Sequence, residues 1–496
     1  MVDSKKQNTA KHIENQGEYQ TEGKSNKINA STHYATCDAR MTAFGGLLSF
    51  VKFIDLLKFE EVFEQYFVMP KRQCSIGHYK MFVGIMVLIF IGFQRLGHFA
   101  YIQTDSMICG LLDVTKLPVI STFWRFLRSM GYNQARSLLR MSGVLRKRVW
   151  ELCGIEYTEI GIDIDTTVST VYGEIEGSRK GHNTKHRGKK GLRPVLLFIE
   201  QTREYICGSQ RRGETITNNE VARQILEIDK LLPACVKKVL IRGDGEFIGV
   251  ESIAACERRG YSFIFGNRRC SPPFPNDGWY RYKEFEYNEV LYQPLGWEKP
   301  MRFVVMRIPK GQKEARQLDL FDDGTFMYRI FVTNLTQRPH KVIIRYDKRA
   351  DVENCIGEAQ REGILAIPSK NFHANGMFFQ LVMLTYNLWR WMKLTAGNRY
   401  NSAYSEENED HCSEDSPAMT AVDKVIIDNT IRIARLKMLF VPAKVVNHAD
   451  KITIKYSSHD ARTEGIIDFL KYLDKRRSEK ISWKDDRRIS PYKKTA

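Results

Sequence analysis

Three acidic residues stand where carboxylates can do chemistry. Asp163 and Asp165 are two residues apart in TEIGIDIDTTV, whose alternation predicts a strand, so both side chains point to the same face. Carboxylates inside an apolar strand are destabilising unless they are paired or bound to a metal. Asp244 follows the apolar run KVLIR, at the carboxyl end of a predicted buried strand, where α/β sheets place ligands. For Asp244 alone, a turn or edge position is an equally good interpretation.

Four polar residues further along the chain fall on one stripe of a predicted helix. Their spacing is three, four and seven residues, close to whole helical turns, and they are Tyr346, Arg349, Glu353 and Gln360. A phenol, a guanidinium, a carboxylate and an amide make a poor core face. They suit a site in which Arg349 binds phosphate, Tyr346 donates a hydrogen bond and Glu353 ligates a hard cation. The alternative is a surface helix with an Arg–Glu pair one turn apart, which contributes little stability.

The elements that must position these acids follow an α/β order. After Glu151 the sequence predicts three antiparallel-looking strands and a helix over 218–232. A buried strand that runs into Asp244, a helix over 250–259 and the strand YSFIFG come next. This order predicts the α/β class with a ribonuclease-H-like catalytic core.

Changes in composition divide the chain into segments. The core is expected in two parts, interrupted by a β-rich insertion with many Pro, Gly and aromatic residues, and preceded by a helical N-terminal DNA-binding region. The expected segments are a disordered tail at 1–36, the helical region at 37–152, the core at 153–270, the insertion at 271–337, the rest of the core with the Glu353 helix at 338–400, an acidic loop at 401–423, and a helix, hairpin and basic tail at 424–496.

Positive charge dominates the sequence. The 496 residues contain 76 Lys and Arg against 58 Asp and Glu, a net charge of +18, which favours a polyanionic partner, nucleic acid before membrane. No acid occurs between Thr115 and Trp150, where the basic residues are Lys116, Arg125, Arg128, Arg136, Arg140, Arg146, Lys147 and Arg148. A solvated helical face would explain one charge run. The absence of acids over two adjacent predicted helices favours contact with DNA, above all through Arg125 and Arg128.

A second basic segment lies beside the first acidic motif. Residues 177–193 (GSRKGHNTKHRGKKGLR) hold seven Lys or Arg, two His and no acid. A flexible basic loop is usually just solvated, but its place next to the candidate site favours contact with the phosphate backbone, through Lys185, Arg187, Lys189 and Lys190. His182 and His186 have helical metal spacing, yet the glycines around them argue against a helix and so against zinc.

Other features exclude several classes of protein. The longest apolar run, 81–93, is shorter than the roughly 20 residues of a membrane span, so it predicts a buried helix and no membrane partner. No secretory signal is present at the N-terminus. The ten cysteines are scattered and form no CxxC pair, which argues against a zinc ribbon or a disulfide framework and fits a reducing cytoplasm.

Together these motifs resemble the DDE transposases of bacterial insertion sequences. Tyr346, Arg349 and Glu353 match the Y-(2)-R-(3)-E-(6)-K signature, in which Gln360 stands at the place of the Lys. IDTTVSTVYG resembles the first Asp motif of the family and IRGDGEF the second. The following NFHANGMFFQLVMLTYNLWRW is similar to the helix after the catalytic Glu in the insertion-sequence 1380 type. Each motif alone is weak, but four in the right order over about 160–395 are strong.

The resemblance implies which residues carry the chemistry. It makes Asp165, Asp244 and Glu353 the catalytic residues and the ligands of two divalent cations, Mg²⁺ or Mn²⁺, which suit phosphodiester chemistry. Asp163 is a rival for the first position, and Glu246 is a weaker rival of Asp244. Tyr346, Arg349 and Gln360 would then line the phosphate.

The resemblance also implies a biological role. It implies cut-and-paste transposition: cleavage at the terminal inverted repeats of a DNA element and strand transfer into target DNA, by a homodimer or larger synaptic complex in the bacterial cytoplasm, associated with the nucleoid. Trp279 or Trp297, in the insertion, would stack on a displaced base, although packing within the insertion explains either residue equally well. Alternatives are a related metal-dependent nuclease without strand transfer and a DNA-binding protein that has lost catalysis.

Overall fold

The computed structural model describes residues 28–181, 183, 186–267, 270–309, 326–407, 429–449, 451–479, 481–483, 489 and 491, with only the backbone for 398–407. The chain forms two units, Met1–Ala39 and Arg40–Ala496. In the described part of the first unit, residues 28–39, a turn is closed by Thr32 N, which donates to Asn29 O at 3.0 Å. Most of the expected N-terminal tail, the acidic loop and the end of the basic tail lie outside the described residues.

One mixed sheet of nine strands forms the centre of the second unit, so the expected α/β class is confirmed. Its strand order is β10-β11-β12-β13-β9-β8-β2-β6-β7. Strand β2 pairs antiparallel with β6 and parallel with β8, while β8 pairs parallel with β9. The first acidic motif lies on β2 and the second follows β8. The five strands of this part of the sheet are β2 (Glu159–Thr166), β6 (Val195–Ile199), β7 (Tyr205–Ser209), β8 (Lys238–Gly243) and β9 (Ser262–Gly266).

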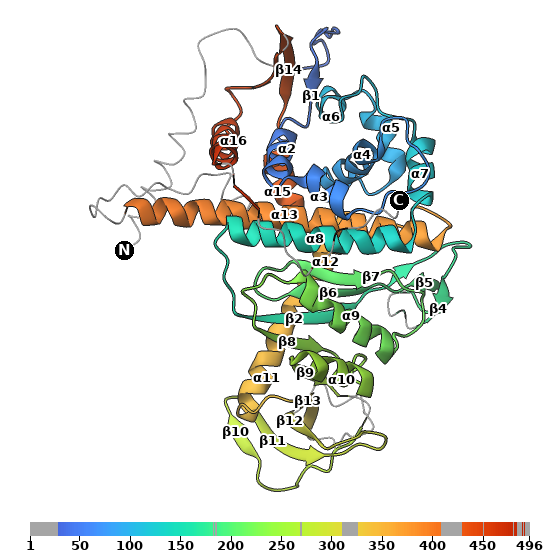
Figure 1. Ribbon diagram of the computed structural model, residues 1–496, viewed down its shortest axis with the longest axis vertical. Helices are drawn as coiled ribbons and strands as arrows, with labels where there is room; N and C mark the ends of the chain where they lie inside the picture. Colours follow the sequence, from blue (N-terminus) through green and yellow to red (C-terminus); the bar gives the residue numbers. More distant parts are fainter. Residues whose placement is uncertain are drawn as a thin grey trace. The chain divides into compact units, whose positions relative to one another are not determined.

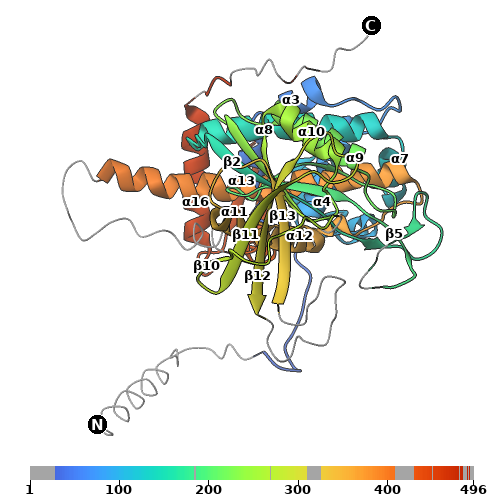
Figure 2. The same cartoon turned by 90° about the horizontal axis from the view of Figure 1, so that it is seen from below.

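The β-rich segment after residue 270 continues this same sheet. Strand β13 pairs antiparallel with β9, so four further strands extend the sheet beyond β9 instead of forming a separate one. Figure 2 shows β11 and β12 side by side in this extension. The four strands are β10 (Tyr280–Tyr282), β11 (Phe285–Tyr292), β12 (Met301–Pro309) and β13 (Phe326–Thr333).

Helices cover both faces of the sheet. Ile160, Ile162 and Ile164 of β2 belong to a core shared with α9 (Asn218–Leu231) and α10 (Val250–Arg259). The opposite face bears Asp163 and Asp165, because successive side chains of a strand alternate. Against that face pack α11 (Pro339–Asp347), through a cluster with β8, β9, β12 and β13, and the helices α12 (Asp351–Ala359) and α13 (Phe372–Glu407), through a larger core.

Two long helices connect the sheet with an N-terminal helical region. Figure 1 shows α8 (Tyr132–Leu152) and α13 lying side by side between the sheet and the N-terminal helices. These helices are α2 (Leu47–Leu56), α3 (Phe59–Tyr66), α4 (His78–Phe90), α5 (Phe99–Ile102), α6 (Ser106–Leu111) and α7 (Ile120–Arg128), with the 3₁₀ turn η1 (Leu96–His98) before α5. The apolar run forms the buried α4, as expected. No helix among the described residues is long and apolar enough to cross a membrane.

Smaller elements complete the unit. Strand β1 (Met41–Thr42) pairs with β14 (Ala443–His448), which forms a hairpin with β15 (Lys451–Tyr456). A three-stranded sheet in the order β3-β5-β4 consists of β3 (Ser169–Thr170), β4 (Arg179–Lys180) and β5 (Lys190–Leu192). The remaining elements are the 3₁₀ turn η2 (Lys348–Ala350), the π-helical turns η3 (Gln360–Ile364) and η4 (Arg435–Leu439), and the helices α15 (Ile431–Ala434) and α16 (Thr463–Ser478).

The second of the two basic helices, α8, does not present all its charges to a partner. Arg146 is fully buried and donates to the carbonyl oxygens of Leu231 (3.0 Å) and Tyr205 (2.7 Å). Arg148 is also buried and donates to Leu57 O at 2.6 Å. The expectation that the basic residues of both helices face DNA is therefore wrong for these two arginines, which tie α8 to its neighbours.

A buried carboxylate joins α8, the sheet and α13. Glu204 has no exposed side-chain surface; its Oε1 lies 3.3 Å from Arg146 Nε and accepts from Trp391 Nε1. Its other oxygen, Oε2, accepts from Trp150 Nε1 (2.9 Å) and Thr202 Oγ1 (2.5 Å). Because these partners come from α8, α13 and the turn before β7, this charge specifies how the two long helices pack on the sheet.

We expect Glu204→Gln to destabilise the protein by about 3–5 kcal/mol, because it leaves Arg146 buried without its counter-charge and sets an amide against indole donors. The matched control is Glu227→Gln, whose carboxylate pairs with Arg136 at 3.4 Å on the surface and should contribute less than about 1 kcal/mol. Urea unfolding followed by tryptophan fluorescence measures both. Equal midpoints for the two variants would show that the buried charge does not organise this core.

Candidate functional site

The two acids of β2 have different partners. Asp163 is almost fully buried and accepts two hydrogen bonds from Arg242 of β8, from Nε at 2.7 Å and Nη2 at 2.8 Å. Arg242 Nη2 also lies 3.0 Å from Glu200 Oε2, and Nη1 donates to Arg345 O at 2.7 Å. Asp163 is thus one half of a buried structural ion pair, which leaves Asp165 as the acid of β2 that is open to a ligand.

Asp165 is half-buried near the carboxyl end of β2. Its Oδ2 lies 3.0 Å from Arg349 Nη2, and its Oδ1 accepts from Thr166 N at 2.7 Å. Burial raises the pKa of Asp165 to about 6, against the opposing charge of Arg349, and the negative charges of Asp244 and Glu353 contribute to the same rise. Two acids far from Asp165 in the sequence, Asp244 and Glu353, therefore both act on its charge.

Asp244 and Glu353 approach this point from two other elements. Asp244 follows β8, the parallel neighbour of β2, and its Oδ1 accepts from Glu246 N at 2.9 Å. Glu353 is exposed in the first turn of α12. Among the described residues no group of three or more His, Cys, Asp or Glu is close enough to hold a metal ion. Asp165 and Asp244 lie at the carboxyl ends of two adjacent parallel strands and the charge of Glu353 acts on Asp165, but the oxygens of the three carboxylates are not gathered into a complete ligand set.

The polar stripe spans four short helical pieces instead of one helix. Tyr346 lies in α11, Arg349 in η2 and Glu353 in α12, and Gln360 begins η3. The Tyr346 ring packs on Phe331 with centroids 4.6 Å apart. Gln360 donates from Nε2 to Thr167 Oγ1 at 2.7 Å, so its amide already has a partner two residues after Asp165.

Arg349 occupies the centre of the stripe. It pairs with Asp165, and Nη2 also donates to Ile164 O at 3.3 Å. Its Nε is buried and has no hydrogen-bond partner within the described part of the chain. Among the described residues, the protein therefore leaves this N–H donor of Arg349 unused.

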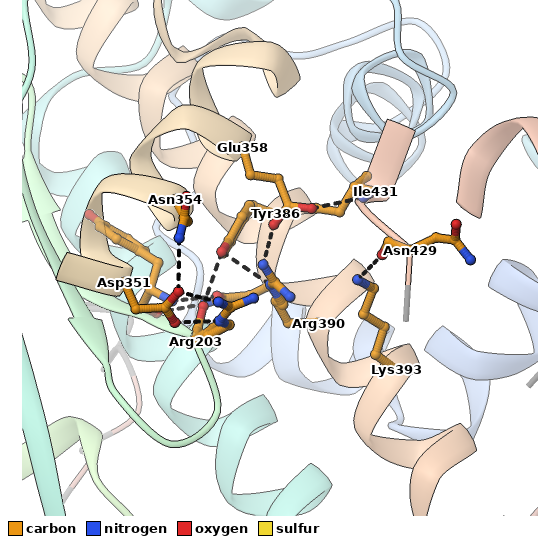
Figure 3. Close-up of polar contacts among 11 residues, drawn as sticks. Arg203, Asp351, Asn354, Glu358, Tyr386, Arg390, Lys393, Asn429 and Ile431 are labelled. Carbon is orange, nitrogen blue, oxygen red and sulfur yellow. Dashed lines mark hydrogen bonds and ion pairs between the residues drawn. The ribbon is translucent and has the colours of Figure 1, made fainter. Parts of the chain in front are cut away.

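The helix that carries Glu353 is anchored on its other side. Asp351 accepts a hydrogen bond from Arg203 Nε at 2.6 Å, a second from Arg203 Nη2, and one from Asn354 Nδ2 at 3.1 Å (Figure 3). Although burial acts to raise it, the hydrogen bonds from Arg203 and Asn354 hold the pKa of Asp351 below its usual range. The first turn of α12 is thereby fixed to the turn between β6 and β7.

Two more acids on the same face of this helical segment are anchored to arginines. Figure 3 shows Glu358 paired with Arg390 of α13, and Glu358 Oε1 also accepts from Ile431 N at 2.8 Å. Glu362 pairs with Arg435 of η4. Positions 351, 358 and 362 are seven and four residues apart, so they share a face about half a turn away from Arg349 and Glu353. The ion pairs on one face hold the helical segment in place, and the opposite face carries Arg349 and Glu353.

The predicted DNA-contacting residues are exposed where the structure describes them. Arg125 and Arg128 are exposed in the last turn of α7. Arg187, Lys189 and Lys190 are exposed just before or at the start of β5. Lys185 and His182 lie outside the described residues. The basic loop is thus attached to a small sheet whose β3 lies only a few residues after Asp165.

The two tryptophans of the sheet extension have partners of their own. Arg307 lies over the Trp279 ring at 4.0 Å from its centroid, and Trp279 Nε1 donates to Pro275 O at 3.2 Å. Trp297 packs against Phe303, with centroids 6.2 Å apart. Both tryptophans are half-buried and both have contacts within the sheet extension, so stacking of either on a displaced base remains a prediction.

Sequence reasoning missed the arginines that surround the site. Arg242 interrupts the apolar strand KVLIR, and an isolated Arg in such a strand was the available signal of a buried partner. Arg193 was counted in the basic loop, but it is buried and bonded to Glu246. Its signal was weak, because only its place directly before the apolar strand PVLLFI separates it from its exposed neighbours.

Comparison with known proteins identifies a family. Residues 24–406 match the family model described as Transposase DDE domain group 1. No curated protein sequence matches. Among solved structures, the chain is similar to a piggyBac transposase synaptic complex with hairpin DNA, at 10% identity and a TM-score of 0.38, over 79% of this chain and 86% of that one. It is also similar to a Mos1 transposase paired-end complex with left transposon end, at 11% identity and a TM-score of 0.16, over 32% and 53% of the two chains.

The raised pKa of Asp165 predicts a pH-dependent stability. Because the folded protein holds the Asp165 proton up to about pH 6 and the unfolded chain only to about 3.8, the stability of the wild type falls relative to Asp165→Asn as pH rises between these values. We expect the variant to gain up to about 3 kcal/mol over the wild type between pH 4 and pH 7, without divalent cations, and no more above pH 7. Urea unfolding across this range tests it; a difference that does not change with pH would contradict it.

Proposed function

We propose that this chain, which belongs to the Transposase DDE domain group 1 family, is a DNA transposase whose catalytic residues are Asp165, Asp244 and Glu353. The observation that carries the assignment is the ion pair of 3.0 Å between Asp165 and Arg349. It joins the strand of the first acid to the helical segment of the third, and the charges of Asp244 and Glu353 both act on Asp165. The spacing of Tyr346, Arg349 and Glu353 supports placement in the YREK group, of the insertion-sequence 1380 type.

The proposed fold of the catalytic core is ribonuclease-H-like. The strand order β7-β6-β2-β8-β9 supports it, with β6 and β7 antiparallel and β8 and β9 parallel to their inner neighbours. The first two acids then lie at the carboxyl ends of two adjacent parallel strands, and β10 to β13 are an insertion before the helix that carries the third. The sequence-derived segment boundaries remain part of this proposal.

The donor set fits Mg²⁺ or Mn²⁺, which prefer carboxylate oxygens and need neither His nor Cys. Two such ions, when bound, would activate the attacking hydroxyl or water and stabilise the leaving oxygen of the phosphodiester. The residues themselves bind and orient: Asp165, Asp244 and Glu353 would hold the cations. Arg349 neutralises Asp165, and its Nε, which has no hydrogen-bond partner among the described residues, would donate to a phosphate oxygen. Tyr346 would add a hydroxyl donor, whereas the Gln360 amide holds Thr167.

Double-stranded DNA is the proposed substrate. The net charge of +18, the exposed Arg125 and Arg128 on α7, and the exposed Arg187, Lys189 and Lys190 support contact with phosphates. In this proposal the enzyme cuts at the terminal inverted repeats of its element and joins the ends to target DNA. It acts as a homodimer or larger synaptic complex in the cytoplasm, at the nucleoid.

Replacing Glu353 with Gln keeps the size and hydrogen bonding of the side chain but removes its charge. We expect Mg²⁺-dependent cleavage of labelled duplexes, taken from the DNA that flanks the gene, to fall by at least about 10³-fold. Binding of the same duplexes should stay within about twofold, because it rests on basic residues elsewhere.

The control must be an acid near the site but off its face. Glu358 is unsuitable because it is buried against Arg390 and Ile431. Asp347→Asn is matched, since Asp347 pairs with Arg329 at the surface of the same helical segment. It should cleave like the wild type. Equal cleavage by the Glu353 and Asp347 variants would contradict the assignment of the third acid.

A further inference from the structure

One arginine of the basic segment does not belong to its exposed surface. Arg193 follows β5 and is only 8% exposed, and its backbone N donates to Arg211 O at 3.1 Å. The exposed Arg187, Lys189 and Lys190 precede it by three to six residues. Its guanidinium therefore points into the protein, toward the acids, while its neighbours point to solvent.

The guanidinium of Arg193 contacts one residue next to each of the first two acids. Nε donates to Thr166 Oγ1 at 3.2 Å, and Nη2 donates to Glu246 Oε2 at 2.6 Å. Thr166 N donates to Asp165 Oδ1 at 2.7 Å, and Glu246 N donates to Asp244 Oδ1 at 2.9 Å. The residue that orients each carboxylate through its backbone is thus held through its side chain by the same arginine.

We propose that Arg193 is a positioning residue: through Thr166 and Glu246 it fixes the carboxylates of Asp165 and Asp244 relative to each other, and so sets the affinity of the site for divalent cations. The proposal rests on the function proposed above. Arg193 itself does not contact a metal or DNA in this role. Residues that orient metal ligands from behind commonly contribute 10–100-fold to metal affinity.

Two physical features make an arginine necessary here. The bridge needs two N–H donors held in one rigid plane, and a Lys ammonium on a flexible stem cannot replace that fork. The Arg193–Glu246 pair is also largely shielded from solvent, with side chains that are 9% and 16% exposed. Loss of one charge leaves the other without its counter-ion in a water-poor place, and the Glu246 turn then has no fixed position.

A second Arg–Glu pair nearby, with a buried Arg and a half-buried Glu, provides a control. Arg211 donates from Nε and Nη2 to Glu220 at 3.0 and 2.7 Å, and its side chain is 6% exposed. This pair fixes the first turn of α9, and none of its hydrogen bonds reaches Thr166, Glu246 or either acid. Its loss should therefore disturb the fold as much as loss of the Arg193 pair without reaching the carboxylates.

The experiment measures Mn²⁺ binding to the full-length protein without DNA, by electron paramagnetic resonance of the free ion, together with cleavage rate and urea unfolding midpoint. The variants are Arg193→Lys, Glu246→Gln and the double variant, with Arg211→Lys and Glu220→Gln as controls. We expect Mn²⁺ affinity to fall by about 10–100-fold in each single Arg193 or Glu246 variant and by no more in the double variant, since both remove the same bridge. The half-activating Mn²⁺ concentration for cleavage should rise equally, whereas the controls keep the wild-type affinity.

Thr166→Val provides a variant that keeps both charges and the fold. It removes only the hydroxyl that accepts the hydrogen bond from Arg193 Nε. It should weaken Mn²⁺ binding while leaving the urea unfolding midpoint close to that of the wild type. Wild-type Mn²⁺ affinity in this variant and in Glu246→Gln would overturn the positioning role, and so would an equal loss in the Arg211 controls. A wild-type protein that neither binds Mn²⁺ nor cleaves DNA would instead overturn the proposed function, and this role with it.

Discussion

Asp163 and Asp165 lie two residues apart on one buried strand, so their negative charges repel each other. Each carboxylate therefore needs its own positively charged side chain as a partner. Asp163 receives the guanidinium of Arg242 from the adjacent strand, and Asp165 receives Arg349 from the helical segment that lies over the sheet. The pair of Asp163 and Arg242 lies within the sheet and joins β2 to β8. The second pair can form only if that segment lies over the end of β2, so it also decides where Glu353 is presented. The ion pair of Asp165 with Arg349 thus helps to determine where Glu353, the third acid, lies.

The remaining anchors hold this arrangement from behind. Asp351, Glu358 and Glu362 bind arginines of three distant segments, so the helical segment cannot rotate without breaking three buried or half-buried ion pairs. For the two buried pairs, those of Glu358 and Glu362, removing one partner is strongly destabilising, because the other charge stays buried. The side that carries Arg349 and Glu353 has fewer partners within the described residues: Glu353 is exposed, and Arg349 Nε has no hydrogen-bond partner there. A preorganised site requires a rigid support and, on its other side, polar groups that are still available to a ligand.

Local pattern predicted much of this molecule. Alternation placed Asp163 and Asp165 on one face of a strand, and helical spacing placed Arg349 and Glu353 on one side of a helical segment. Pattern could not show which acid was structural, because that depends on Arg242, 79 residues away in the chain. For the same reason Arg146 and Arg193 were taken for surface charges, since their partners lie on other elements. The extension of one sheet by β10 to β13 depends on the pairing of β13 with β9, which no local signal specifies.

The central claim is that Asp165, Asp244 and Glu353 hold divalent cations together, and affinity cleavage of the polypeptide tests it most directly. Fe²⁺ replaces Mg²⁺ in the full-length protein, and ascorbate and peroxide generate hydroxyl radicals that cut the backbone next to the bound ion. The account predicts cuts close to residues 165, 244 and 353, all suppressed by excess Mg²⁺ and all lost together in Asp165→Asn. Cuts at other places, or cuts near one of the three residues that survive this substitution, would contradict a shared site.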